Sequence, residues 1–264
     1  MIGVVGDGLL ARAARSAGLD LEAPRDGMTG VIVDVPLNQR ARVLAELRHS
    51  WQVPALVEAP LAATAREARE RLNARDLVPV NALRYGLHTR RLVEELRGAD
   101  DVLETLFAAW RFRGGALIDE KLPLLLDYVR ELCPQRIERI SAMERVDPFV
   151  MTVTLRHAGG VIGSLEVGAH LAGSLPSPSE LVIECFCRET VWHCLPGRQS
   201  VEVVGQNATE WQPDPFVAAV NAFAAWLEGG PRPPGDVQRD VAALELAEKI
   251  REAADAGRAR ILGD

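Results

Sequence analysis

The sequence predicts an α/β domain with a parallel sheet, followed by an α+β domain with an open, mainly antiparallel sheet. Three observations predict this class. Apolar strands alternate with helical segments near the N-terminus, a glycine turn joins the first strand to the first helix, and the later strands alternate apolar and polar residues between turn signals. We place the first domain at residues 1–82 and the second at residues 83–264, with the last helices packing back toward the first domain.

The first strand and the first helix meet in a turn with Rossmann-type spacing. Ile2–Val5 is a short apolar strand, and the run GDGLLA, residues 6–11, leads from it into a helix. In such a turn the first glycine bends the chain, the second lets a pyrophosphate approach backbone N–H groups, and the small last residue lets helix pack on strand. Any strand–helix junction can need small residues, so this spacing alone is a weak signal. It predicts Gly6, Gly8 and Leu9 as dinucleotide contacts.

The rest of the first domain is short for a dinucleotide-binding fold. Residues 19–23 form a weak second strand, and residues 31–36 are already the next buried strand. A complete dinucleotide-binding half needs a further helix, strand and helix between these two, so we expect its adenosine side to be truncated. Helices and strands then alternate at residues 38–48, 54–58, 64–72 and 76–80, which predicts a parallel sheet covered by helices.

The second domain begins with helical segments and continues as a predicted antiparallel meander. Helices are expected at 89–97 and 119–132, strands at 103–112, 137–146, 149–157, 161–169, 181–187, 191–195 and 200–204, and closing helices at 215–227 and 237–256. One face of this sheet has no predicted helix to cover it. Such faces usually bury against another subunit, so we expect a homodimer or a larger oligomer through it.

Composition excludes several classes of protein. The net charge is −7 over 264 residues, which argues against a nucleic-acid footprint, and no apolar run is long enough to span a membrane. No signal peptide is visible, so we expect a cytoplasmic protein.

A zinc site could be suggested by four residues: Cys185, Cys187, His193 and Cys194. However, the neighbouring residues 193 and 194 point to opposite faces of a strand, so we expect no metal.

Six segments, taken in their order along the chain, carry a resemblance to a known family. They are GDGLLA at 6–11, VIVDVP at 31–36, VEAPLA at 57–62, VNALRY at 80–85, GGALID at 114–119, and the tail from Pro215 to Arg258 with WLEGGP at 226–231. Together they resemble the Gfo/Idh/MocA (glucose–fructose oxidoreductase / inositol dehydrogenase) family. This resemblance implies a Rossmann domain that binds NAD(P), followed by a domain whose open sheet carries the substrate and often the oligomer interface.

The resemblance implies an NAD(P)-dependent oxidoreductase that acts on a small polar metabolite, with Pro36, Glu58 and Pro60 among the cofactor contacts. The family lysine beside the nicotinamide corresponds to Ala59, and the family acid/base histidine corresponds to Pro123. Neither side chain can transfer a proton, which argues against ordinary hydride chemistry. Two alternatives stay open: a catalytically degenerate member that binds or scaffolds a partner protein, and a non-redox enzyme (dehydratase, isomerase or cyclase) that reuses the cleft.

The remaining candidates for catalysis lie at the start of the helix that faces the substrate in this family. Lys121 is a candidate acid/base or carbonyl-binding amine, with Asp119 and Asp127 as companions. The simpler interpretation makes Lys121 a solvated lysine and Asp119 a helix cap.

Substrate contacts are expected after the strand that ends near residue 80. Arg84, Tyr85 and His88 are candidates because a guanidinium binds carboxylate or phosphate in a bidentate manner, and Trp110 is a fourth. The alternative is that the first three cap and pack the following helix.

Overall fold

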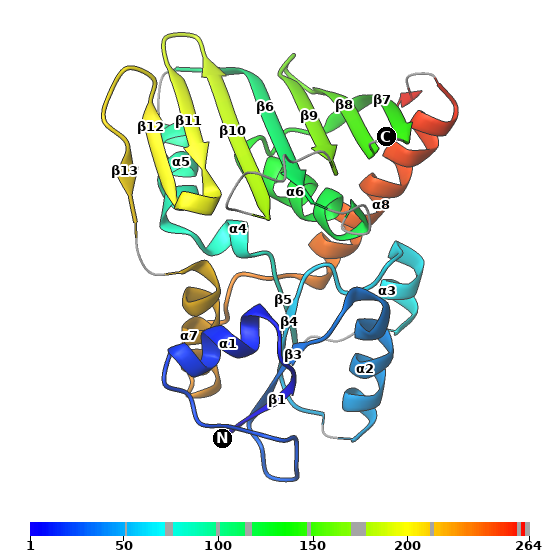
Figure 1. Ribbon diagram of the computed structural model, residues 1–264, viewed down its shortest axis with the longest axis vertical. Helices are drawn as coiled ribbons and strands as arrows, with labels where there is room; N and C mark the ends of the chain where they lie inside the picture. Colours follow the sequence, from blue (N-terminus) through cyan, green and yellow to red (C-terminus); the bar gives the residue numbers. More distant parts are fainter. Residues whose placement is uncertain are drawn as a thin grey trace. The chain divides into compact units, whose positions relative to one another are not determined.

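The computed structural model describes residues 1–50, 52–71, 76–98, 101–113, 118–146, 149–169, 178–211, 214–257 and 260–261. The chain forms two compact units: residues 1–86 with 213–245, and residues 87–212 with 246–264. The first unit contains a five-stranded sheet and the second a nine-stranded sheet (Figure 1). The parallel first sheet and the mainly antiparallel second sheet confirm the predicted fold class. The run at 114–117 that contributed to the family resemblance lies outside the described residues.

All strands of the first sheet run parallel, in the order β2-β1-β3-β4-β5. Because the chain proceeds from β1 to opposite sides of the sheet, β1 and β3 form the switch point at which doubly wound sheets place their ligands. On the far side of β1 the described sheet holds only the two-residue β2. The strands are β1 (Ile2–Gly6), β2 (Leu21–Glu22), β3 (Gly30–Asp34), β4 (Ala55–Glu58) and β5 (Leu77–Val80).

Helices cover both faces of this sheet because its strands are apolar on both sides. Val31 and Val33 of β3 pack into one core with residues of α2, α3 and the start of α8, whereas Ile32 packs into the other with α1 and α7. This continuous apolar pattern is typical of parallel strands buried on both faces. The helices are α1 (Leu9–Ser16), α2 (Leu37–Ser50), α3 (Ala65–Arg71), α4 (Ala82–Tyr85) and α7 (Pro215–Leu227).

The second sheet is not the simple meander expected from the sequence. Its order is β13-β12-β11-β10-β6-β9-β8-β7-β14, so β6 lies between β9 and β10 and runs parallel to β9. β6 is rich in buried apolar residues, and the centre of the sheet shields such a strand best. The strands are β6 (Leu103–Phe112), β7 (Ile137–Val146), β8 (Phe149–His157), β9 (Ile162–Gly168), β10 (Ser179–Cys187), β11 (Val191–Leu195), β12 (Ser200–Val203), β13 (Thr209–Glu210) and β14 (Arg260–Ile261).

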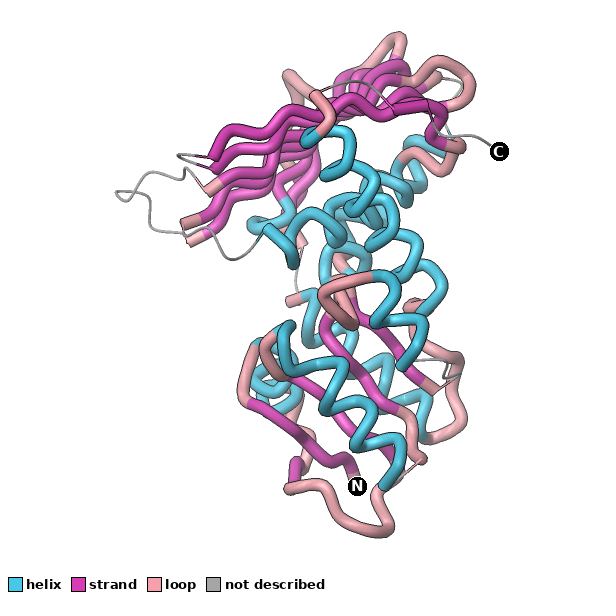
Figure 2. The backbone as a smooth tube through the Cα atoms, turned by 90° about the vertical axis from the view of Figure 1, so that its right-hand side faces the viewer, coloured by secondary structure: helices cyan, strands magenta, loops and turns pink. Residues whose placement is uncertain are grey.

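Helices α5 (Leu87–Gly98) and α6 (Ile118–Leu132) lie against one face of this sheet, and none of the described helices lies on the other face (Figures 1 and 2). Pro123 lies inside α6 without ending it. The last helix, α8 (Val237–Asp255), precedes β14, which extends the sheet at β7.

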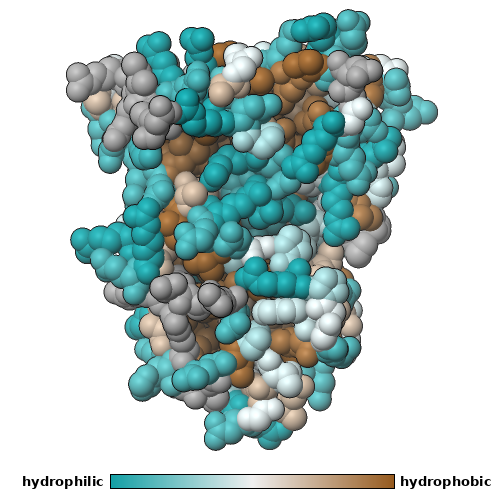
Figure 3. Space-filling model, turned by 180° about the vertical axis from the view of Figure 1, so that it is seen from behind, coloured by the Kyte–Doolittle hydropathy of each residue, from teal (hydrophilic) through white to brown (hydrophobic). Residues whose placement is uncertain are grey.

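No described helix is long and apolar enough to cross a membrane. Hydrophilic side chains cover most of the face seen in Figure 3, and hydrophobic ones form separate patches between them.

Candidate functional site

The turn between β1 and α1 requires glycine at two positions. Gly6 has a φ of +98°, and a Cβ there would collide with the backbone carbonyl of Asp34. A Cβ on Gly8 would collide with the Asp34 carboxylate itself. The register pairs Gly6 with Asp34 at the carboxyl ends of β1 and β3, which explains why the two segments meet so closely. The tight turn predicted from the sequence is therefore present, and an acidic side chain lies against it.

Asp34 occupies the N-terminal end of α1. Its side chain is buried, with 5% of the residue exposed, and Oδ2 accepts a hydrogen bond from the backbone N–H of Ala11 at 2.8 Å. Gly8, at the N-cap position, has no side chain to cap the helix, so Asp34 performs this role from the neighbouring strand. The positive end of the helix dipole favours a negative charge here. The place where a helix N-terminus would take a phosphate thus already holds an anion of the chain itself.

A second carboxylate lies in the same turn. Asp7 pairs with Arg15 at 2.6 Å, and both side chains are exposed. The hydrogen bond and positive charge of Arg15 lower the pKa of Asp7 below its ordinary value. The pair joins the turn to the last residues of α1 and adds a further negative group next to the helix N-terminus.

Arg40 joins the two loops that the family resemblance assigns to the nicotinamide. Its side chain is 3% exposed, and it donates hydrogen bonds to the carbonyl oxygens of Val35 (2.9 Å) and Pro60 (3.1 Å). Its third partner is the Glu58 carboxylate at 2.7 Å. Two predicted cofactor contacts, Glu58 and Pro60, are therefore bound to a buried guanidinium, and a third, Pro36, lies directly after the carbonyl of Val35.

A further polar contact along this edge of the sheet is also made within the chain. The backbone N–H of Leu61 donates to the buried carboxylate of Asp240 at 2.9 Å. Ala59, in the position of the family lysine, is 4% exposed. A buried methyl group offers no proton at this position.

In the second unit, the structure brings two of the predicted site residues together. The Lys121 ammonium lies 4.9 Å from the centre of the Trp110 ring, a cation–π contact. Trp110 also donates from Nε1 to the Ser179 hydroxyl at 2.7 Å. Asp119, by contrast, forms an ion pair with Arg251.

Asp127 is buried further along α6, with 7% of the residue exposed. It lies one turn beyond Pro123, the position of the family histidine, which is also buried inside the helix. This part of α6 therefore offers one buried carboxyl group and no imidazole.

Three of the four predicted substrate contacts lie in the helices α4 and α5. Arg84 and Tyr85 belong to α4, which Asn81 caps by accepting the N–H of Leu83 at 3.2 Å. The Tyr85 hydroxyl donates to the carbonyl oxygen of Pro234, within the same unit.

His88, in α5, is fully buried, and neither ring nitrogen has a hydrogen-bond partner among the described residues. This burial lowers the pKa of His88 from 6.5 to about 4, so the imidazole is neutral at neutral pH.

Of the three cysteines that suggested a metal site, Cys185 and Cys194 are buried thiols and Cys187 is partly exposed. Burial raises the pKa of Cys194 to about 12 and that of Cys185 well above its ordinary value. The Tyr128 hydroxyl lies 3.9 Å from the Cys194 sulfur, whereas His193 pairs with Glu202 at 3.1 Å. Among the described residues, no three His, Cys, Asp or Glu side chains are grouped to hold a metal ion. Thiols of this kind are poor nucleophiles.

Sequence reasoning missed the role of Asp34. A signal was present, because Asp34 is the first charged residue after the apolar run Val31–Val33 and is followed by Val-Pro. What the sequence could not show is that this carboxylate reaches a helix N–H more than twenty residues earlier in the chain.

Neither a protein-family model nor a curated protein matches this sequence. Solved structures do match the fold over nearly the whole chain. A myo-inositol dehydrogenase from Corynebacterium glutamicum is 17% identical, with a TM-score of 0.76 over 100% of this chain and 98% of its own. GenD2 from gentamicin A biosynthesis, in complex with NAD, is 18% identical, with a TM-score of 0.76 over 100% and 96%. An aldose–aldose oxidoreductase from Caulobacter crescentus, complexed with glycerol, is 15% identical, with a TM-score of 0.76 over 98% and 90%.

At these identities the likeness establishes the two-domain oxidoreductase fold, and it supports the family resemblance at the level of the fold. Whether a dinucleotide fits this chain depends on the residues at the β1–α1 turn. The backbone of the β1–α1 turn fits a dinucleotide, but Asp34 does not, since its carboxylate occupies the helix N-terminus that a diphosphate would need. The residues present do not fit the diphosphate of a nicotinamide dinucleotide.

Proposed function

We propose that this chain is a catalytically degenerate protein of the dehydrogenase fold, which binds a small polar metabolite without using a nicotinamide dinucleotide. The observation that carries this proposal is the buried Asp34 carboxylate at the N-terminus of α1. It favours the degenerate alternative over NAD(P)-dependent hydride transfer.

The negative charges of Asp34 and of a bound diphosphate would repel each other. Two unit charges of like sign 4 Å apart repel by about 4 kcal/mol at an effective dielectric constant of 20. Since each 1.4 kcal/mol is a factor of ten, such a repulsion weakens binding by about a thousandfold. Asp7, in the same turn, is exposed and paired with Arg15, so its charge is screened and adds little to this repulsion.

The positions expected to transfer protons support the same proposal. Ala59 is buried in the loop after β4, and Pro123 is buried within α6. A methyl group and a pyrrolidine ring cannot act as general acid or base.

The test is a titration of the full chain with NADH and NADPH, followed by cofactor fluorescence and melting temperature. We expect no saturable binding up to millimolar cofactor. Micromolar binding of either dinucleotide would overturn the proposal.

A second titration, with inorganic diphosphate, tests whether Asp34 is what prevents binding of the diphosphate group. Asp34→Ala should bind diphosphate at least tenfold more tightly than the unmodified chain, because the Ala11 N–H and the helix dipole become available. Asp7→Asn, in the same turn, is the matched control and should change the affinity by less than threefold. Equal affinities for Asp34→Ala and the unmodified chain would show that Asp34 is not the obstacle.

We also propose that the open face of the second sheet forms a homodimer. Phe107 and Phe186 lie on this face, opposite to the side that carries α5 and α6, together with the Arg111–Glu166 ion pair at 2.9 Å. Phe186 is 37% exposed, and a surface with exposed aromatic rings among polar residues is typical of an interface. Light scattering should give a dimer, and Phe186→Glu should shift it to monomer; a monomeric unmodified chain would contradict the proposal.

A further inference from the structure

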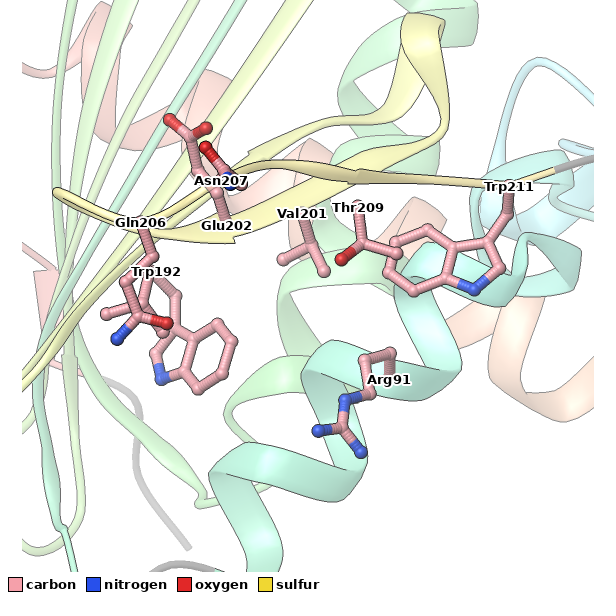
Figure 4. Close-up of a pocket in the computed structure, with 9 residues that line it drawn as sticks. Arg91, Trp192, Val201, Glu202, Gln206, Asn207, Thr209 and Trp211 are labelled. Atoms are coloured by element: carbon pink, nitrogen blue, oxygen red, sulfur yellow. The ribbon is translucent and has the colours of Figure 1, made fainter.

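The second unit contains a pocket that no sequence motif indicated. It has a volume of about 370 Å³ and lies between α5 and the strands β11, β12 and β13 (Figure 4). This volume is within the range of small-molecule sites, at its lower end. The lining residues are Arg91, Trp192, Val201, Glu202, Val203, Gln206, Asn207, Thr209 and Trp211.

Two tryptophans lie at the ends of the pocket (Figure 4), and the strand register accounts for the position of Trp192. Trp192 pairs with Val203, and Val201 pairs with Thr209, so these four side chains share the face that α5 covers. Figure 4 shows Trp192 and Trp211 on either side of Val201, with Arg91 facing them from α5. Val201 is buried, whereas the two indoles are partly exposed. The result is an apolar floor between two aromatic rings.

The charged groups at the pocket already have partners. Arg91 forms an ion pair with Glu95 one turn further along α5. Glu202 lies on the far side of the strands from Arg91 in Figure 4 and pairs with His193 at 3.1 Å. An anionic ligand would therefore have to compete with Glu95 for the guanidinium, and a cationic ligand with His193 for the carboxylate. The arrangement favours a ligand without net charge.

The neutral polar groups, in contrast, are available. Within the described part of the chain, no hydrogen bond is made by the side-chain amide of Gln206, the hydroxyl of Thr209 or the indole N–H groups of Trp192 and Trp211. Amide, hydroxyl and indole groups can donate to or accept from the hydroxyls of a ligand. The C–H face of a sugar ring is apolar and packs against an indole, while its hydroxyls point outward to such groups.

We propose that this pocket binds a neutral polyhydroxylated ring, a monosaccharide or cyclic polyol, stacked against Trp192 and Trp211 with Gln206 and Thr209 bonding its hydroxyls. The inference deepens the proposed function and rests on it in one respect, namely that the ligand is a small polar metabolite. It assigns that metabolite a chemical class and a place within a single unit of the chain.

The test uses the full chain, with myo-inositol and D-glucose as probes and D-gluconate as the charged comparison. Intrinsic tryptophan fluorescence should change saturably with at least one neutral probe at millimolar concentration or below. D-Gluconate should bind at least fivefold more weakly than D-glucose. The proposal is overturned if neither neutral probe binds, or if gluconate binds more tightly than glucose.

Variants locate the site. Trp192→Ala and Trp211→Ala should each weaken binding at least tenfold in calorimetric titrations, and Trp192→Phe should retain part of the affinity because it keeps an aromatic face. Trp226→Phe, in α7 of the first unit, and Glu210→Gln, next to Thr209 but on the opposite face of β13, are matched controls that should leave binding unchanged. Equal affinity in the Trp192 and Trp211 variants would place the probe elsewhere and overturn the assignment.

The two proposals fail separately. NADH binding by the unmodified chain would overturn the proposed function and leave the pocket assignment standing. Absence of sugar binding, with no NADH binding, would overturn the pocket assignment alone. If the circular dichroism spectrum shows that Trp192→Ala does not fold, Trp192→Phe and Trp211→Ala replace it. Weaker binding in both variants supports the assignment, and unchanged affinity in both overturns it.

Discussion

The edge of the first sheet and the pocket of the second unit differ in how their polar groups are used. At the first, Asp34 bonds the helix N-terminus, and Arg40 binds Glu58 and two carbonyl oxygens. At the second, Gln206 and Thr209 have side chains without hydrogen-bond partners among the described residues. Polar groups that bond one another within the chain are not available to a ligand. Polar groups without a partner in the chain can form hydrogen bonds with one. The fold alone would have placed the ligand at the first of these regions.

The largest effect is expected from breaking the buried ion pair at the first edge. Arg40→Met removes the buried guanidinium that the Glu58 carboxylate and two carbonyl oxygens share, which should lower the free energy of unfolding by about 3–5 kcal/mol. Urea unfolding measures this change. The double variant Arg40→Met/Glu58→Gln should recover part of the loss, because no uncompensated charge remains; a loss equal to the sum of the single variants would contradict direct coupling.

His88 differs from the polar groups at the first edge, because it is a buried polar group in the second unit that lacks a partner among the described residues. Its folded-state pKa of about 4 lies below the ordinary 6.5, so the unfolded chain binds more protons between these values. Stability is therefore complete above about pH 6.5 and falls as the pH drops toward 4, by about 3 kcal/mol in all. Urea unfolding at pH 7 and pH 4.5 should show this loss in the unmodified chain and a smaller one in His88→Leu. Equal pH dependence in the two proteins would exclude His88 as the cause.

Asp34→Ala tests the helix cap at the first edge. Loss of the bond to the Ala11 N–H should lower the free energy of unfolding by about 2 kcal/mol, a typical cost for a buried bond to a charged group. Thermal unfolding measures it. Asp34→Asn retains an acceptor and should lose less; if both variants were as stable as the unmodified chain, Asp34 would contribute no cap.

The smallest effect is expected at Lys121. If its cation–π contact with Trp110 is its main role, Lys121→Met should cost about 0.5–1 kcal/mol of stability. Arg136→Met, at an exposed position in the same unit, is a comparison variant that should cost less. Unchanged stability in Lys121→Met together with loss of a measured turnover would instead support the catalytic role predicted from sequence.

Much of the fold could be predicted because its signals are local. The run 31–36, the alternating strands from 137 onward and the helix across 119–132 all carry periodicities that a short window reveals. Short elements such as β13 and β14 were missed, since each consists of two residues and exists only through its partner strand. The position of β6 between β9 and β10 was missed for the same reason: strand order depends on contacts far apart in sequence.

The candidate sites show the same difference between local signals and contacts made only in the folded chain. By itself the sequence determined the order of the elements, the glycine turn at Gly6 and Gly8, and the absence of lysine and histidine at positions 59 and 123. Only the tertiary structure decided that Asp34 fills the N-terminus of α1, and that Trp192 and Trp211 face Arg91 across a pocket. The physical reason is that hydrogen bonds and pockets depend on distances in space, and side chains from separate strands and helices come within reach only when the sheet is assembled.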